Sequence, residues 1–243
     1  MRLMHALALA LLAGIAGCTP HEADVPDLGG TWLPDASGAE PWPAQLPLTA
    51  IARDAMAQFD PAEHDPTTFC MPLGTPRNML QTEYPLEIVQ TPQRILMVLQ
   101  PNLANAEVRR IPLDSPLPEA PDASWYGTSR GHWEGSTLVV ETIGLRPDAP
   151  ISGDGLTHSA ELRVVERFSV MRDDRRGRVL VDDIELHDPQ AYAVPLKTRR
   201  IFVAAPQAKL REGSCVELQW IDKLWRDRLQ EHAEAARAAG SAR

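Results

Sequence analysis

Short apolar segments separated by turns fill the middle and second half of this chain, and they limit the folds that it can adopt. In residues 84–100, two apolar runs flank Thr91 and Pro92, a pattern typical of a β-hairpin with the proline in its turn. Helical segments do not alternate with the strands, so roughly eight or nine strands in sequential hairpins are expected. We therefore predict a mainly β fold, either an antiparallel up-and-down barrel or a strongly curled sheet. The remaining strands are expected at residues 105–114, 132–145, 159–171, 179–188, 196–205 and 213–220.

Two helices are expected outside this series of strands. Residues 47–59 carry apolar side chains at helical spacing, and Thr49 is suited to cap the helix N-terminus. Residues 221–240 predict a C-terminal helix whose first half docks on the domain through one apolar face, formed by Ile221, Leu224, Trp225 and Leu229.

The start of the ordered domain resembles a known barrel architecture. Gly30-Thr31-Trp32 matches the G-x-W start of lipocalins, and we describe the expected architecture as lipocalin-like without assigning the family. A helix and a proline-rich loop over residues 60–79 follow here, where a lipocalin continues into its first strands. The 22 prolines favour short strands and long loops over a helical bundle.

The first 17 residues have the pattern of a bacterial lipoprotein signal peptide. Arg2 precedes an apolar run that is too short to span a bilayer, and the run ends in Ile15-Ala16-Gly17-Cys18, which looks like a lipobox. Lipidation of Cys18 is expected, and Thr19 implies sorting to the outer membrane, facing the periplasm. The alternative is an ordinary secretory signal cleaved near Ala16. The predicted organisation is a tether at 18–28, one β-rich domain at 29–225, and a helix with a tail at 226–243.

Two further cysteines predict a disulfide. With Cys18 acylated, Cys70 and Cys215 remain in an oxidising compartment, where one bridge is the simplest outcome. On the chain-entropy model such a long closed loop stabilises the fold by about 4–5 kcal/mol. Two separate buried thiols are the alternative.

The net charge of -9 argues against one class of partner. An acidic surface repels phosphate backbones, so no nucleic-acid partner is expected. The membrane is expected as a partner through the lipid on Cys18.

The stretch from Gly127 to Gly131 spells G-x-S-x-G, the pattern of a serine-hydrolase nucleophile elbow. An elbow needs a buried strand before Ser129 and a helix after it, whereas loop-like sequence precedes this serine and strand-like sequence follows it. We therefore interpret the small residues as positions where the chain approaches the sheet closely while Trp125 and Trp133 pack. Ser129 stays a weak catalytic candidate.

Residues 159–171 place a carboxylate among apolar side chains. Strand alternation directs Glu166 to the same face as Leu162, Val164 and Phe168. A buried carboxylate needs a partner, for which we consider Arg77, Arg94 and Arg110. The pair either is structural or orients a ligand, and the other candidates for lining a ligand cavity are Glu87, Trp133, Glu134 and His158.

The histidines give little support for a metal site. His132, His158 and His187 lie near strand ends, yet none of their spacings matches a metal-binding motif. The sequence also lacks a glycine-rich phosphate loop, an EF-hand and a C-x-x-C motif. We predict neither a metal nor a cofactor.

Several segments together resemble a family of secreted, often lipid-anchored bacterial proteins. They are CMPLGTPRNM, PLEIVQTPQRI, RRIPLD, WYGTSRGHWEGSTLVVET, THSAELRVVERF, IELHDPQAYAVP and CVELQW, and the match as a whole spans roughly Trp32 to Trp220. The W-x-G-x-S-x-G-x-W-E-G block is the most specific part, and Ser136 stands where that block usually carries Asp. The resemblance implies export and a β-rich domain, and it assigns no reaction.

Three functions are consistent with these observations. The first is a lipid-anchored β domain that binds a small or apolar molecule in its interior. The second is a hydrolase or lyase that uses His158 with Glu161 or Glu166, with Ser129 as a further candidate. The third is an envelope interaction protein with a filled core and an exposed apolar patch.

Overall fold

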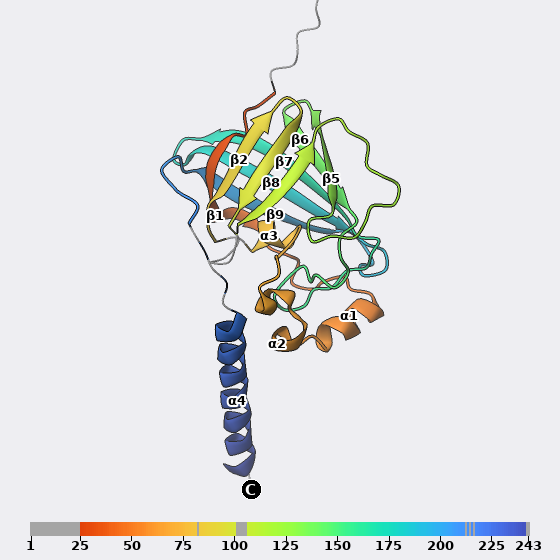
Figure 1. Cartoon of the computed structure of the whole chain (residues 1–243), viewed down its shortest axis with the longest axis vertical. Helices are drawn as coiled ribbons and strands as arrows, with labels where there is room; N and C mark the ends of the chain where they lie inside the picture. Colours follow the sequence, from red (N-terminus) through yellow and green to blue (C-terminus); the bar gives the residue numbers. More distant parts are fainter. Residues whose placement is uncertain are drawn as a thin grey trace, which may run out of the picture.

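The computed structural model describes residues 25–81, 83–100, 106–211, 213, 215 and 217–241, and within them nine antiparallel strands form one sheet in the shape of a nearly closed barrel (Figure 1). The strand order is β4-β3-β2-β1-β9-β8-β7-β6-β5. All neighbours are consecutive in sequence except β1 and β9, which pair with each other, so the predicted antiparallel, up-and-down arrangement is confirmed. The strands are β1 (Gly30–Glu40), β2 (Leu86–Thr91), β3 (Arg94–Leu99), β4 (Glu107–Pro112), β5 (Thr128–Glu134), β6 (Thr137–Ile143), β7 (Arg163–Asp173), β8 (Gly177–His187) and β9 (Leu196–Ala204).

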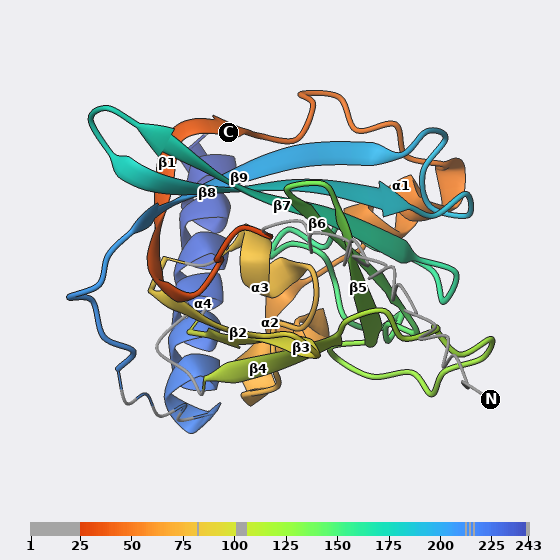
Figure 2. The same cartoon turned by 90° about the horizontal axis from the view of Figure 1, so that it is seen from above.

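The two ends of the sheet, β4 and β5, meet at a seam in the barrel wall (Figure 2). An isolated parallel bridge joins Leu113 and Gly131 across this seam, and the Asp114 amide donates to the Gly131 carbonyl at 2.8 Å. A Cβ on Gly131 would lie 2.9 Å from Leu113 Cδ2. A larger residue at this position would have to displace the side chains packed where the two edges approach each other.

The strands differ from those predicted at three places, and the first is β1 (Gly30–Glu40), which is not among the predicted strands. The predicted strand at 132–145 belongs to a hairpin, in which β5 and β6 flank the turn at Gly135 and Ser136. The prediction of a strand at 213–220 is wrong, because α4 (Glu217–Ser241) begins inside it. Pairing of β1 with β9 occupies the edge that a further strand would need, and the apolar spacing after Glu217 is helical.

The hairpin of β8 and β9 carries charge pairs across its outer face. Glu185 is opposite Lys197, and Lys197 Nζ donates to Glu185 Oε1 at 2.8 Å. Asp183 is likewise opposite Arg199, with 2.6 Å between Arg199 Nε and Asp183 Oδ1. Such exposed pairs support the register and contribute a few tenths of a kcal/mol each.

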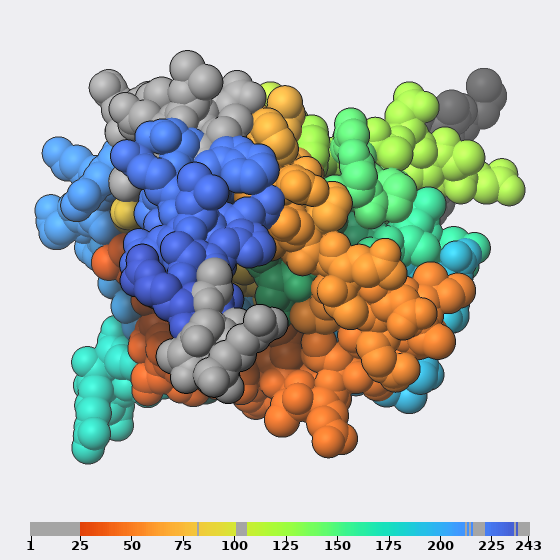
Figure 3. Space-filling view, turned by 90° about the horizontal axis from the view of Figure 1, so that it is seen from below, coloured from red at the N-terminus to blue at the C-terminus, as the bar shows by residue number. Residues whose placement is uncertain are grey.

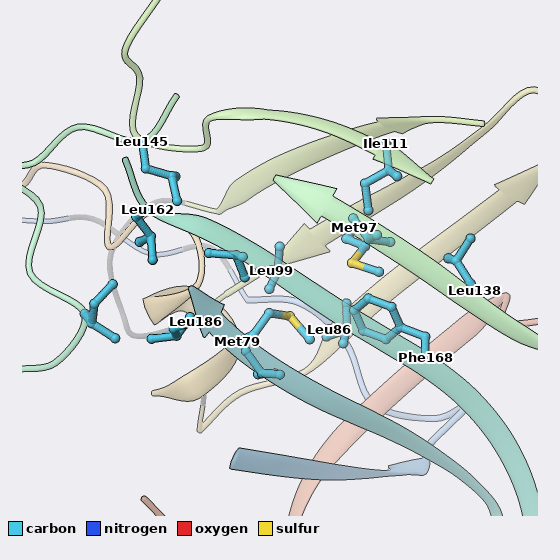
Figure 4. Packing of buried hydrophobic residues seen from close by; sticks show 14 of the residues in the cluster. Met79, Leu86, Met97, Leu99, Ile111, Leu138, Leu145, Leu162, Phe168 and Leu186 are labelled. Atoms are coloured by element: carbon cyan, nitrogen blue, oxygen red, sulfur yellow. The ribbon is translucent and has the colours of Figure 1, made fainter. Parts of the chain in front are cut away.

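The barrel interior is packed with large apolar side chains (Figure 4). Trp32, Phe168 and Phe202 are fully buried there, and each such side chain contributes about 1.5–3 kcal/mol through burial. A short helix, α3 (Arg77–Leu80), lies within the ring of strands when the barrel is seen from above (Figure 2) and adds Met79 to the same core.

The predicted helix at 47–59 is confirmed as α1 (Ala50–Ala57). Thr49 caps it by accepting from the Ala52 amide, and Ala52 is its buried residue. The segment predicted as a proline-rich loop contains α3 and two further short helices, α2 (Pro61–His64) and η1 (Pro66–Phe69). The side chains of Asp60 and Asp65 cap α2 and η1, which explains why these short turns form.

The C-terminal helix α4 extends away from the barrel (Figure 1) and lies beside η1 and α2 (Figure 3). The predicted disulfide is confirmed: Cys70 and Cys215 are joined, with an S–S distance of 2.06 Å, and the bridge fastens the start of α4 to the end of η1. The face expected to dock is largely open, because Trp225 is 45% and Leu229 65% exposed. Arg228 adds a contact with the α2 segment through ion pairs with Asp60 and Glu63, and it stacks on Trp225 of its own helix at 4.8 Å.

The predicted signal peptide, Cys18 and most of the predicted tether lie outside the described residues. Where the description begins, the last tether residues are attached to the barrel: Leu28 is fully buried, its amide donates to Gln90 Oε1 at 2.8 Å, and its carbonyl accepts from Trp32 Nε1 at 3.0 Å. Within the described residues, none of the helices combines the length and apolar character needed to span a membrane.

Candidate ligand-binding site

A buried ion pair crosses the barrel interior between β4 and β7. Nη1 and Nη2 of Arg109 donate to the two carboxylate oxygens of Glu166 at 2.8 and 2.5 Å, and the two side chains are 1% and 0% exposed. Residues 107, 109 and 111 are all buried, because alternate residues of β4 face the interior. Since β4 and β7 belong to the two halves of the sheet that meet at the seam, this pair links the halves through side chains.

The inward orientation predicted for Glu166 is confirmed, but its predicted partners are wrong. Strand alternation turns Arg94 and Arg110 to the exposed outer face. Arg77 lies in α3 and donates from both terminal nitrogens to Asp65, at 2.9 and 2.7 Å. Arg77 therefore stabilises the segment beneath the barrel and does not contact Glu166.

Three charged residues of the interior have nitrogen or oxygen atoms without a hydrogen-bond partner. These atoms are Arg109 Nε, both carboxylate oxygens of Asp182, and Arg200 Nε. Asp182 on β8 is directly opposite Arg200 on β9. Burial raises the pKa of Asp182 well above its ordinary value of 3.8, and the charge of Glu166 raises it further, against the effect of Arg109. Because buried polar atoms are normally paired, this group of exceptions indicates a functional region of the barrel.

A pocket of about 180 Å³ lies at the seam, next to this charged interior. We call it the seam pocket. Its lining residues include two arginines, three residues with a hydroxyl group and no acid, in a chain whose net charge is -9. Arg110 is the exposed arginine of the two, because the Arg109 side chain is only 1% exposed. The lining residues are Val108, Arg109 and Arg110 from β4, and Ser124, Tyr126, Gly127 and Ser129 from the segment that leads into β5 and from β5 itself.

The hydroxyl groups of the seam pocket are positioned by their neighbours. Ser129 Oγ and Thr142 Oγ1 are 2.8 Å apart, across the β5–β6 ladder. Burial raises the pKa of Tyr126, and the nearby charge of Glu107 raises it further. The Tyr126 phenol therefore keeps its proton at neutral pH and is available as a hydrogen-bond donor.

The G-x-S-x-G motif does not form a nucleophile elbow. Ser129 lies within the antiparallel strand β5, whereas an elbow places the serine on a strand-to-helix turn. Both ring nitrogens of His158 are near backbone carbonyls, with Nδ1 2.7 Å from Ser159 O and Nε2 3.0 Å from Ala149 O. Burial lowers the pKa of His158, although these carbonyls oppose the shift. Its hydrogen bonds lie within the connection from β6 to β7 and do not include Ser129.

The other predicted site residues are dispersed. Glu161 is exposed on the turn before β7, and Glu87 is exposed on the outer face of β2. Glu134 is also on the outside, where its carboxylate is paired with Arg167 at 2.7 Å. Trp133 packs against the barrel core. Among the residues predicted to line a ligand cavity, Glu166 and Trp133 therefore belong to the interior.

The three histidines considered for a metal site have separate partners. Nε2 of His132 is 3.2 Å from Glu134 Oε1, and Nε2 of His187 is 3.2 Å from Glu185 Oε2. Among the residues that the structure describes, no group of three or more His, Cys, Asp or Glu side chains is arranged to hold a metal ion.

The interior charges on β4, β8 and β9 were not found by sequence reasoning. Arg109 shares its face with Ile111, and that alternation was the available signal for choosing it over Arg110. Asp182 similarly shares its face with Leu180 and Ile184, all of them fully buried. Nothing in the sequence places the two halves of the lining, from β4 and from the start of β5, at the same seam.

Comparisons with protein-family models, curated proteins and solved structures find no match to this chain. The geometry of the barrel and of its seam therefore carries the functional interpretation.

Proposed function

We propose that this chain is a small-molecule-binding protein of the bacterial cell envelope, and that its ligand occupies the seam pocket in the barrel wall. The observation that carries the proposal is the composition of the pocket lining, in which the exposed Arg110 and three residues with hydroxyl groups surround an apolar valine. A few polar groups beside an apolar side chain are typical of sites that orient a small ligand by a few polar contacts.

The size of the pocket limits the ligand. A cavity of about 150 Å³ in another protein is large enough to hold benzene. The seam pocket, at about 180 Å³, is therefore suited to a molecule of one small ring or a short chain. Long acyl chains and large heterocycles exceed it.

The cell-envelope location is proposed from the signal peptide and the lipobox at Cys18, with anchoring to the outer membrane on the periplasmic side. The disulfide between Cys70 and Cys215 supports it, because such bonds persist in oxidising compartments. Labelling cells with palmitate tests the anchor: incorporation into the wild-type chain and loss in Cys18→Ser are expected. Equal labelling of both chains would contradict the lipid assignment.

Two valine substitutions test the pocket. Val108 lines the seam pocket and is 38% exposed, whereas Val89 is 44% exposed on β2 and is not part of the lining. Val108→Trp is expected to fill the pocket, and Val89→Trp is its matched control. Because both side chains are on the exposed face of a strand, neither change should unfold the barrel, as thermal denaturation would verify.

The probes are benzoate, benzamide and benzylammonium, which share one ring and differ in charge. In ligand-observed NMR at millimolar concentration, at least one should bind the wild type and Val89→Trp and lose binding in Val108→Trp. Binding that persists in Val108→Trp, or no binding of any probe to the wild type, would contradict the proposed function.

A further inference from the structure

We infer that the ligand of the seam pocket is a small organic carboxylate, and this inference rests on the proposed function of the pocket. The lining residues offer the guanidinium group of the exposed Arg110 and three hydroxyl groups. Among the described residues Arg110 has no ion-pair partner, so its charge at the rim is available to a ligand. A cation would meet a like charge at this position and no carboxylate.

The two buried carboxylates near the pocket are already satisfied by other donors. Both oxygens of Glu166 accept from Arg109. Glu107 accepts from the Leu73 amide at 2.6 Å and from Asn78 Nδ2 at 3.1 Å, and burial raises its pKa, which disfavours its charged form. Neither acid is therefore the natural partner of a cationic ligand in the seam pocket.

The single open charge of the lining fits a carboxylate better than a phosphate. Glu166 occupies both terminal nitrogens of Arg109, whose side chain is only 1% exposed, so Arg109 offers no open charge to a ligand. Arg110 is the exposed arginine of the lining. Ser129 and Tyr126 add hydroxyl groups on the opposite side of the seam. One positive charge and two hydroxyl contacts suit a monoanion.

The charge series tests this inference separately from the proposed function. By isothermal titration calorimetry at low ionic strength, we expect benzoate to bind the wild type at least about tenfold more tightly than benzamide, and benzylammonium not to bind. If benzamide or benzylammonium binds as tightly as benzoate, and that binding is lost in Val108→Trp, the pocket function stands and the carboxylate assignment is overturned. If none of the three binds, the proposed function itself fails.

Inorganic phosphate and two variants complete the test. Tighter binding of phosphate than of benzoate would overturn the assignment of the ligand as a carboxylate and would favour an oxyanion of higher charge. Arg110→Gln removes the charge at the rim and should reduce the preference for benzoate over benzamide several-fold. Arg94→Gln, an arginine on the outer face of β3 that does not line the pocket, is the control and should leave the preference unchanged. An unchanged preference in Arg110→Gln would contradict the role given to that arginine.

Discussion

Glu166→Gln is expected to weaken the barrel strongly, because it removes the charge that neutralises a buried guanidinium. Both partners are almost completely buried, and two charge-assisted hydrogen bonds join them. Removing one partner of such a pair costs about 3–5 kcal/mol. Asp182 and Glu107 are the other acids whose charges interact with Arg109, and Asp182 has the larger effect, so the single variant should lie near 3 kcal/mol and the double variant with Asp182→Asn near 5 kcal/mol.

Urea denaturation of the disulfide-intact protein at pH 7, followed by tryptophan fluorescence, measures these free energies of unfolding. Glu134→Gln is the matched control, because Glu134 forms an exposed pair with Arg167 and its loss should have little effect on the free energy of unfolding. Hydrogen exchange should also accelerate in β4 and β5, since the buried pair links the two sides of the seam. A loss below about 1 kcal/mol for Glu166→Gln would refute the reasoning, as would equal effects of the two Glu→Gln changes.

Three further outcomes are expected. Burial holds the pKa of Asp182 in the folded state above its ordinary 3.8, so the wild type loses stability as pH rises from about 4 toward the folded pKa. Asp182→Asn should remove that loss. In urea denaturation, the variant's gain in free energy of unfolding over the wild type should therefore grow from pH 4 to pH 7. An advantage of equal size at both pH values would contradict the shift. Replacing Cys70 and Cys215 by serine removes a disulfide between positions 145 residues apart and should lower the free energy of unfolding by about 4–5 kcal/mol. A reducing agent should have no further effect on that variant. Arg228→Ala should speed hydrogen exchange in α4 and leave the barrel strands unaffected, because the ion pairs of Arg228 join α4 to Asp60 and Glu63 of the α2 segment. Slower or unchanged exchange in α4 would argue against this attachment.

The period-two patterns of the sequence predict most of the sheet because hairpins are local. The turn at Thr91 and the long runs that became β7, β8 and β9 each carry their own alternation and turn residues. The end of the chain was misread because a short apolar run fits both a strand and the first turns of a helix. Only the pairing of β1 with β9, a contact between distant segments, decides between them.

The candidate site was less predictable because it depends on contacts between segments that are distant in the sequence. Alternation alone identifies Glu166 as an inward carboxylate. Its partner depends on which strand faces it across the barrel, and the closure of the barrel decides that. The G-x-S-x-G motif shows the reverse case. Its glycines are explained by close approach, since a Cβ on Gly127 would lie 2.6 Å from the Ile143 carbonyl oxygen, and Gly131 meets Leu113 across the seam. The motif therefore shapes the barrel wall beside the pocket.

The position of the seam halfway along the chain bears on tolerance to proteolytic cleavage. The connection from β4 to β5 includes the exposed residues Pro118, Glu119 and Ala120, which are open to a protease. A cut there separates one fragment with β1–β4 from another with β5–β9, yet the β1–β9 ladder and the bond between Cys70 and Cys215 still join them. The nicked protein should remain assembled, and the two fragments, produced as separate polypeptides, are natural candidates for reconstitution into one barrel.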